Sequence, residues 1–160
     1  MERDPQLQAY ERVMAAAGRL LAVRPRTEHE LRSRLMAGDA PPGVVDRVLA
    51  RLDQLGLVDD RAFARQWVEE RSRRHGPAVL VSELQNKGVE REVAEEAVAA
   101  AGLDEEAQAR ELAARLVVKV ARRPLREQRF RLRAMLARRG ISEEAAAAGV
   151  RAVLPPEGWD

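Results

Sequence analysis

The segment LVSELQNKGV (residues 80–89) carries a pattern that the chain uses again, and this pattern decides the expected fold. Two leucines four residues apart are followed, four residues later, by a glycine and a β-branched residue. The same spacing returns 52 residues later in LRAMLARRGI (residues 132–141), and Leu31 and Leu35 repeat the leucine pair 49 residues earlier. Leucines at this spacing share one helix face. We therefore predict one helical unit used three times.

Residues that begin or end helices divide each unit into three helices. Thr27-x-x-Glu30 is a capping box, Pro41-Pro42 is expected to open the next helix, and Ser142 suits a helix N-terminus. The predicted helices lie near residues 6–23, 27–37, 42–54, 60–74, 77–87, 90–101, 105–121, 124–139 and 142–153.

The composition supports an all-α fold. Aromatic residues are only 3% of the chain, whereas the good helix formers Ala, Leu, Arg and Glu dominate. We predict three tandem three-helix repeats that form an elongated, curved array. Since three short helices bury little apolar surface alone, neighbouring units are expected to share a continuous core. The predicted units are residues 1–58, 59–103 and 104–160, the last with a short C-terminal tail.

The residues that most enzymes need are scarce. The chain has no cysteine, its two histidines (His29 and His75) lie far apart, and no glycine-rich phosphate loop follows a strand. We therefore expect a protein without catalytic residues, metal site or cofactor. No apolar run reaches the roughly 18 residues of a membrane span, so a cytoplasmic protein with no membrane partner is expected.

Positive charge is concentrated near the C-terminal end. Residues 110–139 contain eleven Lys or Arg against Glu111 and Glu127, a net charge of +9, although the whole chain carries only +2. Arginine suits phosphate and carboxylate partners, so this segment is expected to contact phosphates or an acidic protein surface. The alternative is a solvated helix face that reflects the general use of arginine in this chain.

Three groups of cations are candidates for the binding surface. The third unit ranks first, because arginines near the break at Gly76 and in the first unit could instead complement the negative ends of their own helices. Phe63 and Trp67, spaced i, i+4, are expected in the core rather than at a base-stacking platform. The candidate residues are Arg122, Arg123, Arg126, Arg129, Arg131, Arg133, Arg138 and Arg139, followed by Arg32, Arg34, Arg71, Arg73, Arg74 and Lys87.

Longer motifs resemble a known family. The segment DDRAFARQWVEER (residues 59–71), followed by Gly76-Pro77 and ELQNKGV (residues 83–89), resembles the RecX family, bacterial regulators of the RecA recombinase. TEHELRSRL (residues 27–35) and LARRGI (residues 136–141) resemble the corresponding parts of the first and third units of that family. The resemblance extends from about residue 12 to residue 154.

The resemblance implies a non-enzymatic regulator in DNA repair, recombination and SOS control. Such a protein lies in the groove of the RecA–DNA filament and suppresses RecA ATPase, strand exchange and co-protease activities. Its implied partners are the RecA filament and single- or double-stranded DNA without strong sequence preference, and we expect a monomer. Two alternatives are a stand-alone helix-turn-helix-like DNA-binding protein and a purely structural helical scaffold.

Overall fold

The structure is a computed structural model that describes residues 3–158. Within these residues the chain forms nine α-helices and one 3₁₀ helix, η1, and has no β-strand. The elements are α1 (Pro5–Val23), α2 (Glu28–Met36), α3 (Val44–Gln54), α4 (Asp60–Arg71), α5 (Pro77–Asn86), α6 (Arg91–Ala100), α7 (Glu105–Leu116), η1 (Val117–Lys119), α8 (Leu125–Arg138) and α9 (Glu143–Val153).

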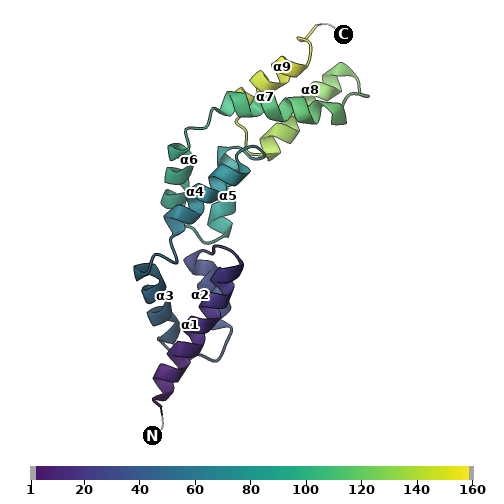
Figure 1. The fold of residues 1–160 in the computed structure, drawn as a ribbon. Helices are drawn as coiled ribbons and strands as arrows, with labels where there is room; N and C mark the ends of the chain where they lie inside the picture. Colours follow the sequence, from purple (N-terminus) through teal and green to yellow (C-terminus); the bar gives the residue numbers. More distant parts are fainter. Residues whose placement is uncertain (1–2, 159–160) are drawn as a thin grey trace.

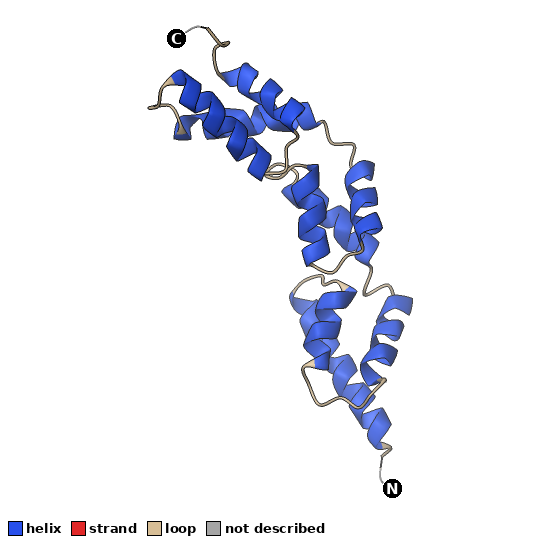
Figure 2. Ribbon diagram, turned by 180° about the vertical axis from the view of Figure 1, so that it is seen from behind, coloured by secondary structure: helices blue, strands red, loops and turns tan. Residues whose placement is uncertain are grey.

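The helices form three successive groups, which we call unit 1 (α1–α3), unit 2 (α4–α6) and unit 3 (α7–α9). The units follow one another along an elongated, curved molecule, with the two termini at opposite ends (Figure 1). The view from behind shows the same helical array (Figure 2). The predicted fold class is confirmed. The predicted boundaries after residues 58 and 103 lie in the connections between units and stay a prediction.

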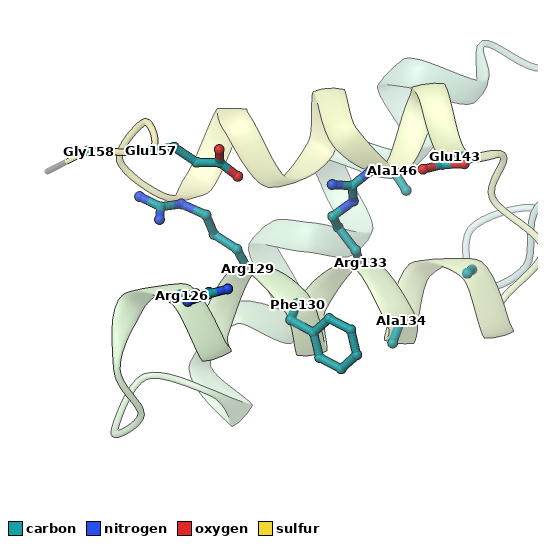
Figure 3. Close-up of a pocket in the computed structure, with 10 residues that line it drawn as sticks. Arg126, Arg129, Phe130, Arg133, Ala134, Glu143, Ala146, Glu157 and Gly158 are labelled. Atoms are coloured by element: carbon teal, nitrogen blue, oxygen red, sulfur yellow. Dashed lines mark hydrogen bonds and ion pairs between the residues drawn. The ribbon is translucent and has the colours of Figure 1, made fainter. Parts of the chain in front are cut away.

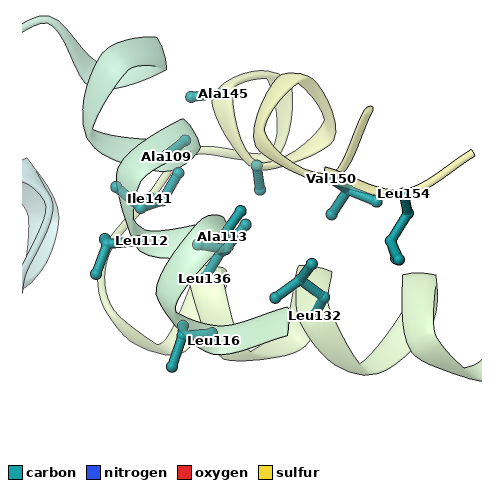
Figure 4. Packing of buried hydrophobic residues seen from close by; sticks show 11 residues of the cluster. Ala109, Leu112, Ala113, Leu116, Leu132, Leu136, Ile141, Ala145, Val150 and Leu154 are labelled. Atoms are coloured by element: carbon teal, nitrogen blue, oxygen red, sulfur yellow. The ribbon is translucent and has the colours of Figure 1, made fainter. Parts of the chain in front are cut away.

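Each unit has a hydrophobic core of its own. The leucine pair of the second helix lies at its centre, and Leu31, Leu84 and Leu136 are fully buried. The expected continuous core is wrong, because the buried apolar residues fall into three separate clusters. The physical reason is that the first and third helices of each unit also pack against each other, and so enclose the leucine pair within the unit. Figure 4 shows this arrangement in unit 3.

The capping box at the start of α2 is confirmed. Thr27 Oγ1 accepts a hydrogen bond from the Glu30 backbone N–H at 3.1 Å, and the Glu30 carboxylate accepts one from the Thr27 N–H at 3.3 Å. The side chain of Ser142 likewise caps α9. The third helix starts slightly later than predicted. It begins at Val44 because Gly43, with a φ of +82°, interrupts the helical conformation after Pro42.

Two helices are shorter than predicted. α4 ends at Arg71 rather than residue 74, and a turn follows in which the His75 N–H bonds the Arg71 carbonyl. α7 ends at Leu116 rather than residue 121, and the chain tightens into η1. Val117, Val118 and Val120 explain this second difference, because β-branched residues lose side-chain freedom in an α-helix.

Neighbouring units meet through the ends of their second helices. The Thr27 hydroxyl, at the start of α2, donates to the carbonyl of Lys87, which caps the end of α5, at 2.6 Å. The Gly76 N–H, at the start of α5, donates to the carbonyl of Arg139, which caps the end of α8, also at 2.6 Å. Lys87 and Arg139 are 52 residues apart, and Thr27 and Gly76 are 49 apart, so the two junctions use equivalent repeat positions.

Glycines make these junctions possible. A Cβ atom on Gly88 would lie 2.2 Å from the Cβ of His29 in unit 1, and one on Gly140 would lie 2.6 Å from the Val79 nitrogen in unit 2. Both glycines also have a positive φ, of +85° and +86°. The left-handed conformation and the close approach each favour glycine at these positions.

We predict that Gly88→Ala destabilises the protein more than Gly102→Ala does. Both glycines have a positive φ, but a Cβ on Gly102 would have no heavy atom within 4 Å. Both variants should therefore carry a backbone strain of about 1–2 kcal/mol. Only Gly88→Ala should carry a further cost, of about 1–3 kcal/mol, because units 1 and 2 must separate. Urea unfolding measures both free energies, and equal costs for the two variants would contradict this account of the junction.

Candidate nucleic-acid interface

The candidate arginines of unit 3 lie on and beside α8. Arg122 and Arg123 occupy the turn before the helix, Arg139 caps its end, and the other five lie on α8 itself. A helix surface of this kind brings together residues three and four positions apart. The arginines therefore point in several directions around α8 and form more than one surface.

One surface is an open groove between α8, α9 and the chain that follows α9. Its volume is about 810 Å³. Arg126, Arg129, Phe130 and Arg133 line it from α8, and Glu143 lines it from α9. Figure 3 shows these side chains and Glu157 of the C-terminal segment around the groove. The groove thus combines three guanidinium groups with an aromatic ring and two carboxylates.

The three groove arginines are held differently. Arg133 forms an ion pair with Glu143 at 3.1 Å. Arg129 donates hydrogen bonds to the backbone carbonyls of Pro155 and Pro156, at 2.8 and 2.6 Å, and so fixes the C-terminal segment against α8. Arg126 is exposed and forms no ion pair within residues 3–158. Arg126 is therefore the groove arginine most available to an anionic partner.

Two further arginines share one carboxylate. Arg123 and Arg131 each bond Glu127 at 2.8 Å, and the hydrogen bond from Arg131 is the main cause that lowers the pKa of Glu127. One negative charge between two guanidinium groups leaves a net positive charge at the start of α8. Arg122, which precedes this trio, is exposed and has no ion pair in the described part of the chain.

A second basic surface forms where units 2 and 3 meet. His75, Met135, Arg138 and Arg139 line an open concavity of about 370 Å³. The turn after α4 lies against the same place, since Arg139 donates to the Arg74 carbonyl at 3.4 Å. The structure therefore brings this turn, with its candidates Arg73 and Arg74, to the candidate pair at the end of α8.

The two candidate cations of unit 1, Arg32 and Arg34, differ in their partners. Arg32 pairs with Glu28 and Asp46, and its hydrogen bond with Asp46 is the main cause that raises its pKa. Arg34 is exposed on α2 and has no ion pair among the described residues. A part in binding stays a prediction for Arg32 and Arg34, but unit 1 already neutralises Arg32.

Trp67 is the centre of a similar internal arrangement in unit 2. Its ring stacks on Phe63 with 5.8 Å between centroids, and the Arg71 guanidinium lies over its ring at 4.5 Å. Glu83 accepts from both Trp67 Nε1, at 2.8 Å, and Arg71 Nε, at 3.0 Å. The aromatic pair is half-buried and packs against the unit 2 core, as predicted, and Arg71 serves to cover it.

Glu30 connects units 1 and 2. Its largely buried carboxylate accepts from Arg24 at 3.0 and 3.2 Å and from Lys87 Nζ at 3.1 Å. Burial raises the pKa of Glu30, but the hydrogen bonds from Arg24 and Lys87 outweigh this effect, and its pKa lies below the ordinary value. Lys87, a candidate for binding, therefore has a structural partner across the junction.

The described residues contain neither a cluster of metal ligands nor a membrane span. No group of three or more His, Asp or Glu side chains there could hold a metal ion. Likewise, none of the helices in residues 3–158 is long and apolar enough to cross a membrane.

Comparison with known proteins identifies the family. Models of the first and second three-helix domains of RecX match residues 14–52 and 59–98. The regulatory protein RecX of Streptomyces coelicolor is 39% identical over 99% of this chain and 84% of its own length. That of Mycobacterium ulcerans is 44% identical over 92% of this chain and 87% of its own. The chain belongs to the RecX family.

Solved RecX structures have the same fold as this RecX-family protein. The crystal structure of RecX from Lactobacillus salivarius superposes with a TM-score of 0.81 at 21% identity, and covers 91% of this chain and 96% of that one. A second RecX crystal structure gives a TM-score of 0.79 at 22% identity, and covers 91% of this chain and 76% of the other. These similarities concern the three-unit architecture.

Sequence reasoning missed two parts of the surface of this RecX-family protein. Phe130 lines the groove and its side chain is 74% exposed, although aromatic residues usually signal a core. The positive charge of residues 110–139 pointed to the segment that contains Phe130, but nothing in the sequence singled out its ring. Arg115 donates to the Arg73 carbonyl at the junction of units 2 and 3, a contact that no local pattern reveals.

We predict that Glu30→Gln lowers the free energy of unfolding by about 1–3 kcal/mol at pH 7, because Arg24 and Lys87 lose their charged acceptor. A carboxylate whose folded-state pKa is depressed stabilises the protein above its unfolded pKa, and this stabilisation is lost as the pH falls through the folded pKa. The difference between wild type and variant should therefore shrink below about pH 4. Urea unfolding at pH 7 and pH 3 measures it.

Glu69→Gln is the control for this prediction. Glu69 is exposed on α4 and has no ion pair among the described residues, so its variant should stay within about 0.5 kcal/mol of wild type at both pH values. If the free energies of unfolding of wild type and Glu30→Gln differed as much at pH 3 as at pH 7, the charge of Glu30 would not be what connects the units.

Proposed function

We propose that this RecX-family protein binds the RecA–DNA filament and lowers RecA ATPase, strand exchange and co-protease activity. The observation that carries the proposal is the pair of arginines without carboxylate partners, Arg122 and Arg126, at one end of a long helical array that belongs to a family of regulatory proteins. A filament offers an extended surface, and three units in line match an extended partner better than a compact one.

The protein acts in this proposal as a cytoplasmic monomer that performs no catalysis itself. The concavities described above are open surfaces to which arginines contribute most of the charged groups, rather than enclosed sites with a nucleophile beside a base. Inhibition would then come from occupancy of the filament, which needs affinity and shape but no reacting group.

DNA is a partner through its phosphates in this proposal. Arginine contacts to phosphates position a protein without reading bases, which implies little sequence preference.

The stand-alone transcription factor is the weaker alternative, because a recognition helix must present side chains to base edges. The third helices of the units suit this poorly: α6 (Arg91–Ala100) exposes Glu92, Glu95 and Glu96. A purely structural scaffold would leave the positive end of unit 3 without a role.

We predict that Arg122→Glu/Arg126→Glu weakens binding to single-stranded DNA by about tenfold or more at low salt. Each lost phosphate contact should also make the dependence of log affinity on log salt shallower by about 0.7. Inhibition of RecA ATPase on single-stranded DNA should fall in parallel. Neither arginine has an ion pair in residues 3–158, so the change should leave the fold intact, which thermal unfolding checks.

Arg12→Glu/Arg19→Glu is the matched control. Both residues are exposed on α1, in unit 1, and neither has an ion pair among the described residues. The net charge changes equally in the two variants, so the control should inhibit RecA as wild type does. If both variants lost inhibition equally, the effect would come from net charge alone. If Arg122→Glu/Arg126→Glu inhibited RecA as fully as wild type does, the surface that inhibits RecA would lie elsewhere.

A further inference from the structure

Phe130 is an exposed aromatic residue in a positively charged setting. Its side chain is 74% exposed, whereas the other aromatic side chains within residues 3–158 are at least partly buried. It lies at the edge of the groove that Arg126 also lines, and its ring extends from α8 on the side away from α9 (Figure 3). An exposed phenyl ring buries little apolar surface in the core of its own unit. Its exposure therefore suggests a contact with something outside unit 3.

The repeat relates Phe130 to residues near the junctions of the other two units. The residue 52 positions earlier is Ala78, and the residue 49 positions before that is His29. His29 packs against Gly88 of the next unit, and Val79, which follows Ala78, packs against Gly140 of the next unit. Phe130 thus occupies the repeat position of His29, which contacts the next unit, and lies one residue before the position of Val79, which makes the corresponding contact in unit 2.

The charges around Phe130 indicate the chemistry of its partner. Arg126 lies four residues earlier on the same face of α8, and Arg122 lies one further turn away, in the preceding loop. Neither forms an ion pair among the described residues, and both are exposed. A ring with cations on one side fits a partner that offers flat apolar surfaces joined by negative charges.

We propose that Phe130 stacks on a base of single-stranded nucleic acid while Arg122 and Arg126 hold the adjacent phosphates. This inference rests on the proposed function, since it names the form of nucleic acid that the unit 3 surface takes. Bases in a duplex are stacked on one another and hide their faces, whereas a single strand exposes them to an aromatic side chain. The groove, at about 810 Å³, is open and leaves room for an unstacked base.

The test compares two oligomers in the absence of RecA: a thymidine oligonucleotide of about 12 residues, and an abasic phosphodiester of the same length. Phe130→Ala should weaken binding of the thymidine oligomer by about 5- to 150-fold and leave binding of the abasic oligomer unchanged. Phe130→Trp should retain the preference for bases. Val118→Ala is the control, because Val118 is 72% exposed in the same unit and should show the wild-type preference.

Several outcomes would overturn the inference. One is wild-type binding of the thymidine oligomer by Phe130→Ala; another is an equal loss on both oligomers, which would mean a general change of the surface. A third is concentration-dependent self-association of the wild type that Phe130→Ala abolishes without a change in oligomer binding, because the ring would then contact a second copy of the chain.

The assays separate this inference from the proposed function. If Phe130→Ala loses the preference for bases but the wild-type protein does not inhibit RecA ATPase, stacking stands and the proposed function fails. If Phe130→Ala keeps wild-type oligomer binding while Arg122→Glu/Arg126→Glu abolishes inhibition, the proposed function stands and stacking fails.

Discussion

The carbonyl groups at the ends of α5 and α8 accept hydrogen bonds from the N-cap residues of α2 and α5, and this end-to-end contact sets the line of the whole molecule. The C-terminal end of a helix carries partial negative charge and the N-terminal end partial positive charge, so the contact is electrostatically favourable in both junctions. It also requires glycine where α5 and α8 end, because His29 and Val79 approach the backbone there too closely for a side chain. The array follows from repetition of one joint.

The repeat and its helices could be predicted from the sequence because their causes are local. The leucine pairs, the capping box at Thr27 and Ser142 before α9 act within a few residues of themselves. The separate cores could not be predicted, since periodicity shows which face is apolar but not which helix covers it. The contact between Arg139 and the Arg74 carbonyl and the exposure of Phe130 depend on how units are placed, which no local pattern records.

The distribution of charge differs between the two ends of the array. In units 1 and 2, Glu30 binds Arg24 and Lys87, and Glu83 binds Arg71, so these cations stabilise the junction or the unit itself. In unit 3 the acids are too few for the arginines. In the proposed function the positive end of unit 3 meets an extended anionic partner, and junctions that fix its place would reduce the conformational entropy lost on binding. In the proposed function the contacts at the junctions and the charge of unit 3 therefore act together.

Distances between spin labels test this account most directly, and the chain suits the method because it has no native cysteine. Cysteines would replace Ser33 on α2, Ser82 on α5 and Ala114 on α7, all of which are exposed. Pulsed electron paramagnetic resonance on the pairs 33/82 and 82/114 should give one narrow distance distribution across each junction. Broad or multiple distributions across either junction would show that the units are loosely tethered, and would contradict the end-to-end joint as the basis of the structure.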